Sequence, residues 1–157
     1  NAAVRKDVLT PFINSLRANN LKVGLYYSLS DWSHENYTHF TRKINRYKIS
    51  EEPGRWSKYI DYFHGQLVEL ADKYNPDLWW FDGDWSRQAD QWRMQEVREM
   101  LLEWNPQAIL NSRMSGYGDY ATPEQGIPIQ GPEGPWELCM TINDSWDTKF
   151  PRSTTTT

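Results

Sequence analysis

Short apolar runs alternate with amphipathic helical patterns along this 157-residue chain. Four runs are short, apolar and bounded by polar residues, as buried strands are; they lie at 22–28, 78–82, 108–111 and 138–142. Apolar residues recur at helical spacing over 10–20, 56–74 and 91–104. The polar stretch 29–55 and the Gly- and Pro-rich stretch 112–137 are expected to be loops. Alternation of this kind predicts parallel βαβ units in an α/β fold.

The positions of the polar residues decide between two kinds of parallel sheet. Acidic and polar residues gather just after the apolar runs, where the active sites of (β/α) barrels lie. No run is followed by a Gly-rich phosphate loop, which argues against a nucleotide-binding sheet. We therefore predict a (β/α)8 TIM-barrel-like fold, with residues 1–150 in the barrel and 151–157 as a disordered tail.

The number of predicted strands sets the expected share of the barrel. A complete barrel needs eight strands and about 200 residues or more, so this chain is expected to form about half of one. An open sheet leaves two edges with unpaired backbone groups, which favour pairing with another strand. We expect either a homo-oligomer or pairing with a missing N-terminal half of the barrel.

Composition excludes several classes of function. The net charge is −4 and no basic cluster occurs, so nucleic acid is not an expected partner. No apolar stretch is long enough to span a membrane, and no signal peptide is visible. The single cysteine, Cys139, cannot form an intrachain disulfide, and the three histidines lack metal-ligand spacing. No G-x-S-x-G elbow of a serine hydrolase occurs. No metal or organic cofactor is expected.

Asp82 is the first candidate for catalysis. It directly follows four apolar residues at the end of a predicted strand, where a charge is costly without hydrogen-bond donors or a ligand. Trp80 lies two residues earlier and so on the same side of the strand, while Gly83 permits a sharp exit. A carboxylate beside an aromatic wall suits a glycosidase nucleophile. The alternatives are a structural turn cap at Asp82, or catalysis by its neighbour Asp84.

A retaining glycosidase needs a second carboxyl group about 5–5.5 Å from the first. Glu124, Glu133 and Glu137 all lie in later loops that could reach the same face, and spacing does not separate them. Arg113 follows the run at 108–111 and could bind sugar hydroxyls or a catalytic carboxylate. The 9 Trp and 9 Tyr residues suit either a sugar-binding enzyme or a well-filled core.

Six segments together resemble one family, the α-L-fucosidases of glycoside hydrolase family 29. They are G-L-Y-Y-S-L-S-D-W (24–32), P-D-L-W-W-F-D-G-D-W (76–85), N-S-R (111–113), G-D-Y-A-T-P-E-Q (118–125), P-W-E-L-C-M-T-I (135–142) and N-D-S-W (143–146). The resemblance implies a retaining enzyme with a (β/α)8-like catalytic domain, acting on fucosylated glycans without a cofactor. It also implies a secreted, periplasmic or lysosomal location.

The resemblance assigns roles residue by residue. It implies Asp82 as nucleophile and Glu124 as acid/base. It further implies that the fucose is bound by Trp80, Arg113, Trp136 and one tyrosine of the pair Tyr26 and Tyr27, of which we favour Tyr26. The histidine pair that the family brings to its pocket does not occur in this sequence. The alternative function is therefore a catalytically inactive fucose-binding or structural barrel fragment.

Overall fold

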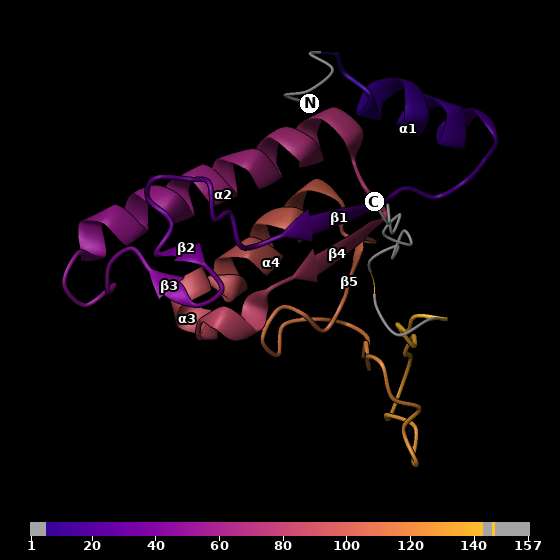
Figure 1. The fold of residues 1–157 in the computed structure, drawn as a ribbon. Coiled ribbons are helices and arrows are strands. Elements are labelled where there is room, and N and C mark those ends of the chain that lie inside the picture. Colours follow the sequence, from indigo (N-terminus) through magenta and orange to yellow (C-terminus); the bar gives the residue numbers. More distant parts are fainter. Residues whose placement is uncertain (1–5, 143–145, 147–157) are drawn as a thin grey trace, which may run out of the picture.

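A parallel three-stranded sheet forms the centre of the computed structural model, which describes residues 6–142 and 146 (Figure 1). The strands are β1 (Gly24–Ser28), β4 (Leu78–Asp82) and β5 (Ile109–Leu110), with β4 in the middle. Helices connect β1 to β4 and β4 to β5, so the predicted βαβ alternation is confirmed over this part of the chain.

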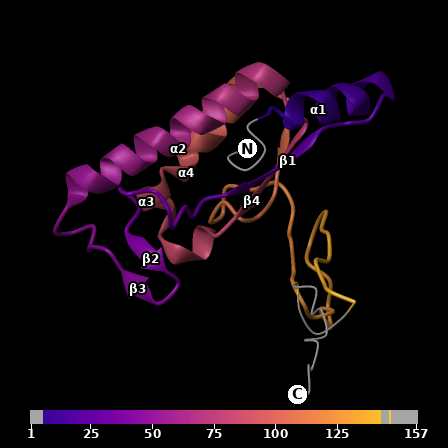
Figure 2. The ribbon, with the colours of Figure 1, turned by 45° about the horizontal axis from the view of Figure 1, so that its top comes forward.

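The helices are α1 (Leu9–Ala18), α2 (Pro53–Tyr74), α3 (Ala89–Trp92) and α4 (Met94–Trp104). α2 has proline in its first turn and ends at Asn75, which adopts the left-handed conformation with φ 41°. α2 and α4 contact each other and lie on the same side of the sheet in both views (Figure 2). α1 lies by the end of α2, where the Thr10 and Tyr74 hydroxyls are 3.1 Å apart.

The helix predicted over 91–104 is divided in two, which corrects the prediction. Arg93 has φ 54°, a left-handed conformation that ends α3 and precedes α4. Trp92 is fully buried, and its Nε1–H donates to the Asp84 carbonyl at 3.1 Å. Burial of this indole offsets the cost of the left-handed arginine, a cost that apolar periodicity does not reveal.

Alternate residues of the strands face opposite sides of the sheet. In β4, Trp79 and Phe81 are buried in the core, whereas Trp80 and Asp82 face the other side and are only partly buried. In β1, Tyr27 packs on Phe63 of α2 with ring centroids 5.7 Å apart. The helices thus cover one face of the sheet and leave the other for the site.

The segment 29–55, predicted to be a loop, contains a small hairpin of β2 (His39–Thr41) and β3 (Ile44–Asn45). Tyr37 and Tyr47 from this segment are buried, and Tyr37 packs on Tyr59 of α2 at 4.8 Å between ring centroids. The hairpin is therefore fastened beside the amino-terminal half of α2.

The fourth predicted strand, 138–142, does not form. Cys139 instead pairs with the loop before it: its N–H donates to Pro123 at 3.0 Å, and its carbonyl accepts from Gln125 at 2.8 Å. Residues 112–142 contain only isolated bridges in place of strands. Arg113, Asp119 and Glu137 of this segment still contact the strands, while its later part extends away from the sheet (Figure 1). The predicted tail at 151–157 lies outside the described residues.

Candidate active site

The carboxyl ends of β1 and β4 form the base of the site. Their register places Tyr26 beside Trp80 and Ser28 beside Asp82, the last residue of β4. The chain then turns at Gly83, whose φ is 90°. A Cβ at Gly83 would lie 3.1 Å from the Ser30 hydroxyl oxygen, so glycine is favoured by both conformation and space. The turn leaves Asp82 at the open end of the strand.

Two aromatic rings stand next to Asp82 on the helix-free face of the sheet. Tyr26 and Trp80 are stacked, with ring centroids 5.5 Å apart and an interplanar angle of 19°. The Tyr26 hydroxyl donates to Asp82 Oδ2 at 2.7 Å. Burial, together with the adjacent Asp82 carboxylate, raises the pKa of Tyr26 to about 12. Tyr26 therefore remains a hydrogen-bond donor at neutral pH.

Arg113 joins two carboxylates. Its Nη1 donates to Asp82 Oδ1 at 2.8 Å, and its Nη2 donates to Glu124 Oε2. The Arg113 side chain is only 11% exposed, and its guanidinium carbon lies 5.0 Å from the centre of the Trp80 ring. Burial by itself would lower the pKa of Arg113, but Glu124 and Asp82 outweigh burial and raise it. Both carboxylates thus share one fully charged cation.

Contacts between two loops hold Arg113 and Glu124 in place. The hydroxyls of Ser112 and Thr122 lie 2.8 Å apart, and the Thr122 N–H donates to the Ser112 hydroxyl at 3.1 Å. Glu124 forms an isolated parallel bridge with Cys139. The segment 138–142 therefore pairs with the Glu124 loop. The sequence predicts it to be another strand of the sheet.

Asn111 ties β5 to β4 one residue before Asp82. The side chain is fully buried; its Oδ1 accepts from the Phe81 N–H and its Nδ2 donates to the Phe81 carbonyl, both at 2.9 Å. An amide side chain here takes the place of a backbone partner and fixes the end of β4.

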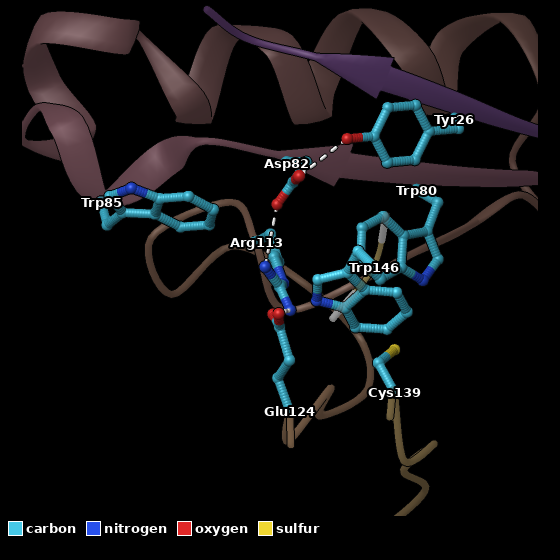
Figure 3. A pocket seen from close by; sticks show the side chains of 8 residues that line it. All are labelled: Tyr26, Trp80, Asp82, Trp85, Arg113, Glu124, Cys139 and Trp146. Atoms are coloured by element: carbon cyan, nitrogen blue, oxygen red, sulfur yellow. Dashed lines mark hydrogen bonds and ion pairs between the residues drawn. The ribbon is translucent and has the colours of Figure 1, made fainter. Parts of the chain in front are cut away.

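These side chains enclose a pocket of about 390 Å³. It is lined by Tyr26, Trp80, Asp82, Trp85, Arg113, Glu124, Cys139 and Trp146 (Figure 3). Five of the six residues named from sequence as catalytic or sugar-binding line it, namely Tyr26, Trp80, Asp82, Arg113 and Glu124. In the close view Trp85 stands on one side of Asp82, with Tyr26 and Trp80 on the other.

Comparison with known proteins shows the family of this chain. The family model described as Alpha-L-fucosidase matches residues 1–156. The chain belongs to the alpha-L-fucosidase family.

Curated relatives in this family are considerably longer. The tissue alpha-L-fucosidases of Macaca fascicularis and Homo sapiens are 28% identical over 156 residues and 27% identical over 151 residues. Each match covers 90% of this chain and 31% of the relative. The chain thus spans about a third of the length of the curated fucosidases it matches.

Solved fucosidase structures share the fold. Alpha-L-fucosidase isoenzyme 1 from Paenibacillus thiaminolyticus superposes with a TM-score of 0.73 at 29% identity, covering 90% of this chain and 39% of the other. A family 29 alpha-L-fucosidase from Bacteroides thetaiotaomicron, trapped as a covalent intermediate with 2-fluoro-fucosyl fluoride, has a TM-score of 0.71 at 25% identity. That match covers 88% of this chain and 36% of the other.

The other candidate site residues do not line the pocket. Glu137 accepts a hydrogen bond from the Trp80 indole N–H, so it holds one of the two stacked rings. Trp136 does not line the pocket; it lines a neighbouring apolar cavity of about 370 Å³ with Leu78 and Ile109. Glu133 is exposed and does not line the pocket either.

Three lining residues were not singled out from the sequence: Trp85, Cys139 and Trp146. Each occurs in one of the segments that carry the family resemblance, and that is the only signal that could have marked them. Trp85 lies in the single-turn 3-10 helix Asp84–Ser86, and Cys139 and Trp146 lie outside the helices and strands, so no periodicity tells which way their side chains point.

In the described ranges 6–142 and 146, no cluster of three or more His, Cys, Asp or Glu residues is arranged to hold a metal ion. Over the same ranges, no helix is both long and apolar enough to cross a membrane.

Proposed function

We propose that this chain carries the catalytic carboxylates of a retaining α-L-fucosidase, with Asp82 as nucleophile and Glu124 as acid/base. The observation that supports this most is Arg113, which binds Asp82 with one nitrogen and Glu124 with the other. Two carboxylates held by one guanidinium, at the open end of a strand and beside stacked aromatic rings, suit hydrolysis with retention.

The reaction has two displacements. Asp82 attacks the anomeric carbon of a terminal α-L-fucoside while Glu124 protonates the departing glycosidic oxygen, so that a fucosyl ester forms and the alcohol leaves. Glu124 then takes a proton from water, the water oxygen attacks the anomeric carbon, and the Asp82 carboxylate is released. Glu124 accepts a hydrogen bond from Arg113 on Oε2, so Oε1 is the oxygen that can carry the proton that Glu124 donates.

Binding of the sugar falls to the same face of the sheet. The apolar C–H face of a pyranose packs on an aromatic ring, and the Tyr26–Trp80 stack offers such a surface. Tyr26 and Arg113 present donors that suit sugar hydroxyls. We assign Tyr26, Trp80 and Arg113 to fucose binding, and Trp85 and Trp146 as further walls of the pocket.

We also infer that the three parallel strands belong to a (β/α)8-like barrel. Parallel βαβ units, helices on one face and a site at the carboxyl ends of the strands all support this. The relatives are longer than this chain, and further strands are needed to close such a barrel.

A mechanism-based label tests the proposal. The purified chain is incubated with 2-fluoro-fucosyl fluoride, which forms a fucosyl ester with the nucleophile that hydrolyses slowly. Intact mass spectrometry followed by peptide mapping should place one fluorofucosyl group on Asp82. Asp84→Asn is the matched control and should label normally, whereas Asp82→Asn should not label.

Each alternative has its own result. A label on any other residue would refute Asp82 as the nucleophile. Binding of fucose without a label would favour the inactive fucose-binding fragment, and failure of both would favour a structural fragment.

A further inference from the structure

A second groove adjoins the pocket. It has a volume of about 480 Å³ and lies between the β2–β3 hairpin and the segment that follows β4. Trp85 lines both spaces, and its side chain is exposed. We call it the polar groove; its lining includes Asn45, Lys48, Trp85, Arg87, Gln88 and Gln91. Trp85 therefore forms a wall common to the pocket and the polar groove.

The charge of the polar groove differs from that of the whole chain. The net charge of the chain is −4, yet the lining of the groove contains two cations and no aspartate or glutamate. One cation, Lys48, is paired with Glu51 at 2.7 Å, and both side chains are largely exposed. The other, Arg87, forms no ion pair with any carboxylate in the part of the chain that the structure describes.

Arg87 is held in place but not neutralised. Its Nη1 donates to the Ser86 carbonyl at 2.6 Å, and its Nη2 lies 3.2 Å from the Thr38 hydroxyl and 3.1 Å from His39 Nδ1. Its Nε is buried and has no partner among the described residues. Burial lowers the pKa of Arg87, the direction expected for a cation removed from water without a counter-ion. Arginine nevertheless stays charged at neutral pH, so an unpaired cation remains at the groove.

We propose that the polar groove binds an anionic sugar, one carrying a carboxylate or a sulfate, in the part of the glycan beyond the fucose. A partly buried guanidinium without a counter-ion gains most from an anionic oxygen, which forms charge-assisted hydrogen bonds with it. The amides of Asn45 and Gln88 suit the hydroxyls of the same sugar. That the anionic sugar is attached to a fucose rests on the proposed function; the anion preference of the groove does not.

The test uses probes without fucose, so that it stands apart from the nucleophile experiment. Titration calorimetry at low salt compares N-acetylglucosamine 6-sulfate with N-acetylglucosamine on the full chain. We expect the sulfated sugar to bind at least about tenfold more tightly, which corresponds to about 1.4 kcal/mol. The preference should shrink as salt is added.

Two variants locate the effect. Arg87→Gln should abolish the preference for the sulfated sugar, and Arg42→Gln, an exposed arginine of the same hairpin outside the groove, should keep it. Because Arg87 also contacts the hairpin, Lys48→Gln serves as a second variant. Lys48 is 70% exposed, so its replacement should leave the melting temperature unchanged while weakening the preference.

Several outcomes would overturn the proposal. Equal affinity for the two sugars would do so without any variant, and so would a preference that a folded Arg87→Gln protein retains. Inorganic sulfate that binds as tightly as the sulfated sugar would reduce the groove to a general anion site. If Asp82 is not labelled but the sulfated sugar still binds more tightly, the proposed function is wrong and the anionic-sugar site is supported.

Discussion

Asp82 and Asp84 are two residues apart but lie in different surroundings. Asp82 faces the pocket, whereas Asp84 accepts hydrogen bonds from the Ser115 N–H at 2.9 Å and the Ser115 hydroxyl at 3.1 Å. Loss of a covalent nucleophile should cost several kcal/mol of transition-state stabilisation. We predict that Asp82→Ala lowers turnover of an aryl α-L-fucoside at least about 1,000-fold, or about 4 kcal/mol.

Asp84→Ala is the matched comparison. It should lower stability by about 1–2 kcal/mol through loss of the Ser115 contacts, with turnover per folded molecule nearly unchanged. The reverse pattern, with Asp84 essential and Asp82 dispensable, would move the nucleophile to Asp84. Steady-state rates and urea unfolding of the two variants decide between them.

The choice of leaving group in the substrate tells whether Glu124 or Glu137 is the general acid. An acid is needed only when the leaving oxygen is a poor leaving group, so Glu124→Ala should slow alkyl and sugar fucosides far more than activated aryl fucosides. We expect this selectivity to exceed about tenfold, as befits general acid catalysis. Glu137→Gln should affect both substrates alike, since Glu137 supports Trp80. If only the Glu137 variant is selective, the assignment is wrong.

A substitution at Asn111 tests how much its side chain stabilises the end of β4. In Asn111→Asp the donor to the Phe81 carbonyl becomes a carboxylate oxygen, so two acceptors face each other in a buried place. We predict a loss of about 3 kcal/mol at pH 7. The pKa of the new acid should be raised, so the loss relative to the parent protein should diminish as pH falls and the acid is protonated. Urea unfolding at pH 7 and pH 4.5 measures this, and a loss independent of pH would contradict it.

Sequence reasoning could place some site residues but not all of them. Asp82 and Trp80 could be placed because strand alternation puts them on one face next to a glycine exit. Periodicity does not tell which of Tyr26 and Tyr27 faces the site. In the structure Tyr27 packs against α2, and Tyr26 lies beside Trp80 and lines the pocket. Trp136 lies in a long irregular loop, where the position of a residue in the sequence does not tell which way its side chain points.

Asp77 shows how one residue can join separate elements. It accepts from the Val23 N–H at 2.8 Å and pairs with Lys22 at 3.0 Å and with Arg17 of α1. Burial alone would raise the pKa of Asp77, but the Val23 N–H and the two cations outweigh it and lower the pKa. A lowered folded pKa means stability that is present above about pH 4, the unfolded value, and is lost as pH falls through the folded pKa.

We therefore predict that Asp77→Asn lowers stability by about 2 kcal/mol at pH 7 and by less below pH 4. Unfolding curves of parent and variant at several pH values check this. A difference that grows towards low pH would show that the sign is wrong. Asp72 lies in the last turn of α2 and forms no ion pair with any described residue, so Asp72→Asn is the matched control.

At the level of elements, apolar patterns succeed where tertiary packing agrees with them. The strand at 78–82 has the predicted bounds because its apolar residues and its terminal carboxylate mark both ends. Periodicity predicts a single helix at 91–104 because the apolar pattern continues through Arg93, although the backbone there is left-handed. The run at 138–142 has the composition of a strand, but its partner is the Glu124 loop rather than the sheet.

For the molecule as a whole, the free edge of β1 is the feature that most favours association. Within 6–142 and 146, β1 pairs on one side only, with β4, whereas the outer side of β5 is covered because the Leu110 N–H and carbonyl both bond to Asp119. Leu21, which precedes β1, and Ile109 of β5 are large apolar side chains that are exposed. An unpaired strand edge and exposed apolar surface favour association.

We predict that the purified chain self-associates at micromolar concentration and dissociates on dilution. Light scattering against concentration measures this. Lys introduced at Ile109 should weaken association, while Lys introduced at Ile127, an exposed loop position away from the sheet, should not. A monomer of 18.6 kDa with a cooperative melt at all concentrations would contradict the prediction.

The fork of Arg113 has a consequence for charge balance through the catalytic cycle. If Asp82 and Glu124 act as proposed, the pair holds one negative charge at the start, on Asp82, and one in the fucosyl ester, on Glu124. The charge moves between the acids while its total stays constant. A guanidinium with one N–H on each acid can follow that charge without moving its own centre. Lysine has a compact ammonium on a flexible stem in place of this rigid fork and would have to reorient between the two acids, so Arg113→Lys should slow both displacements.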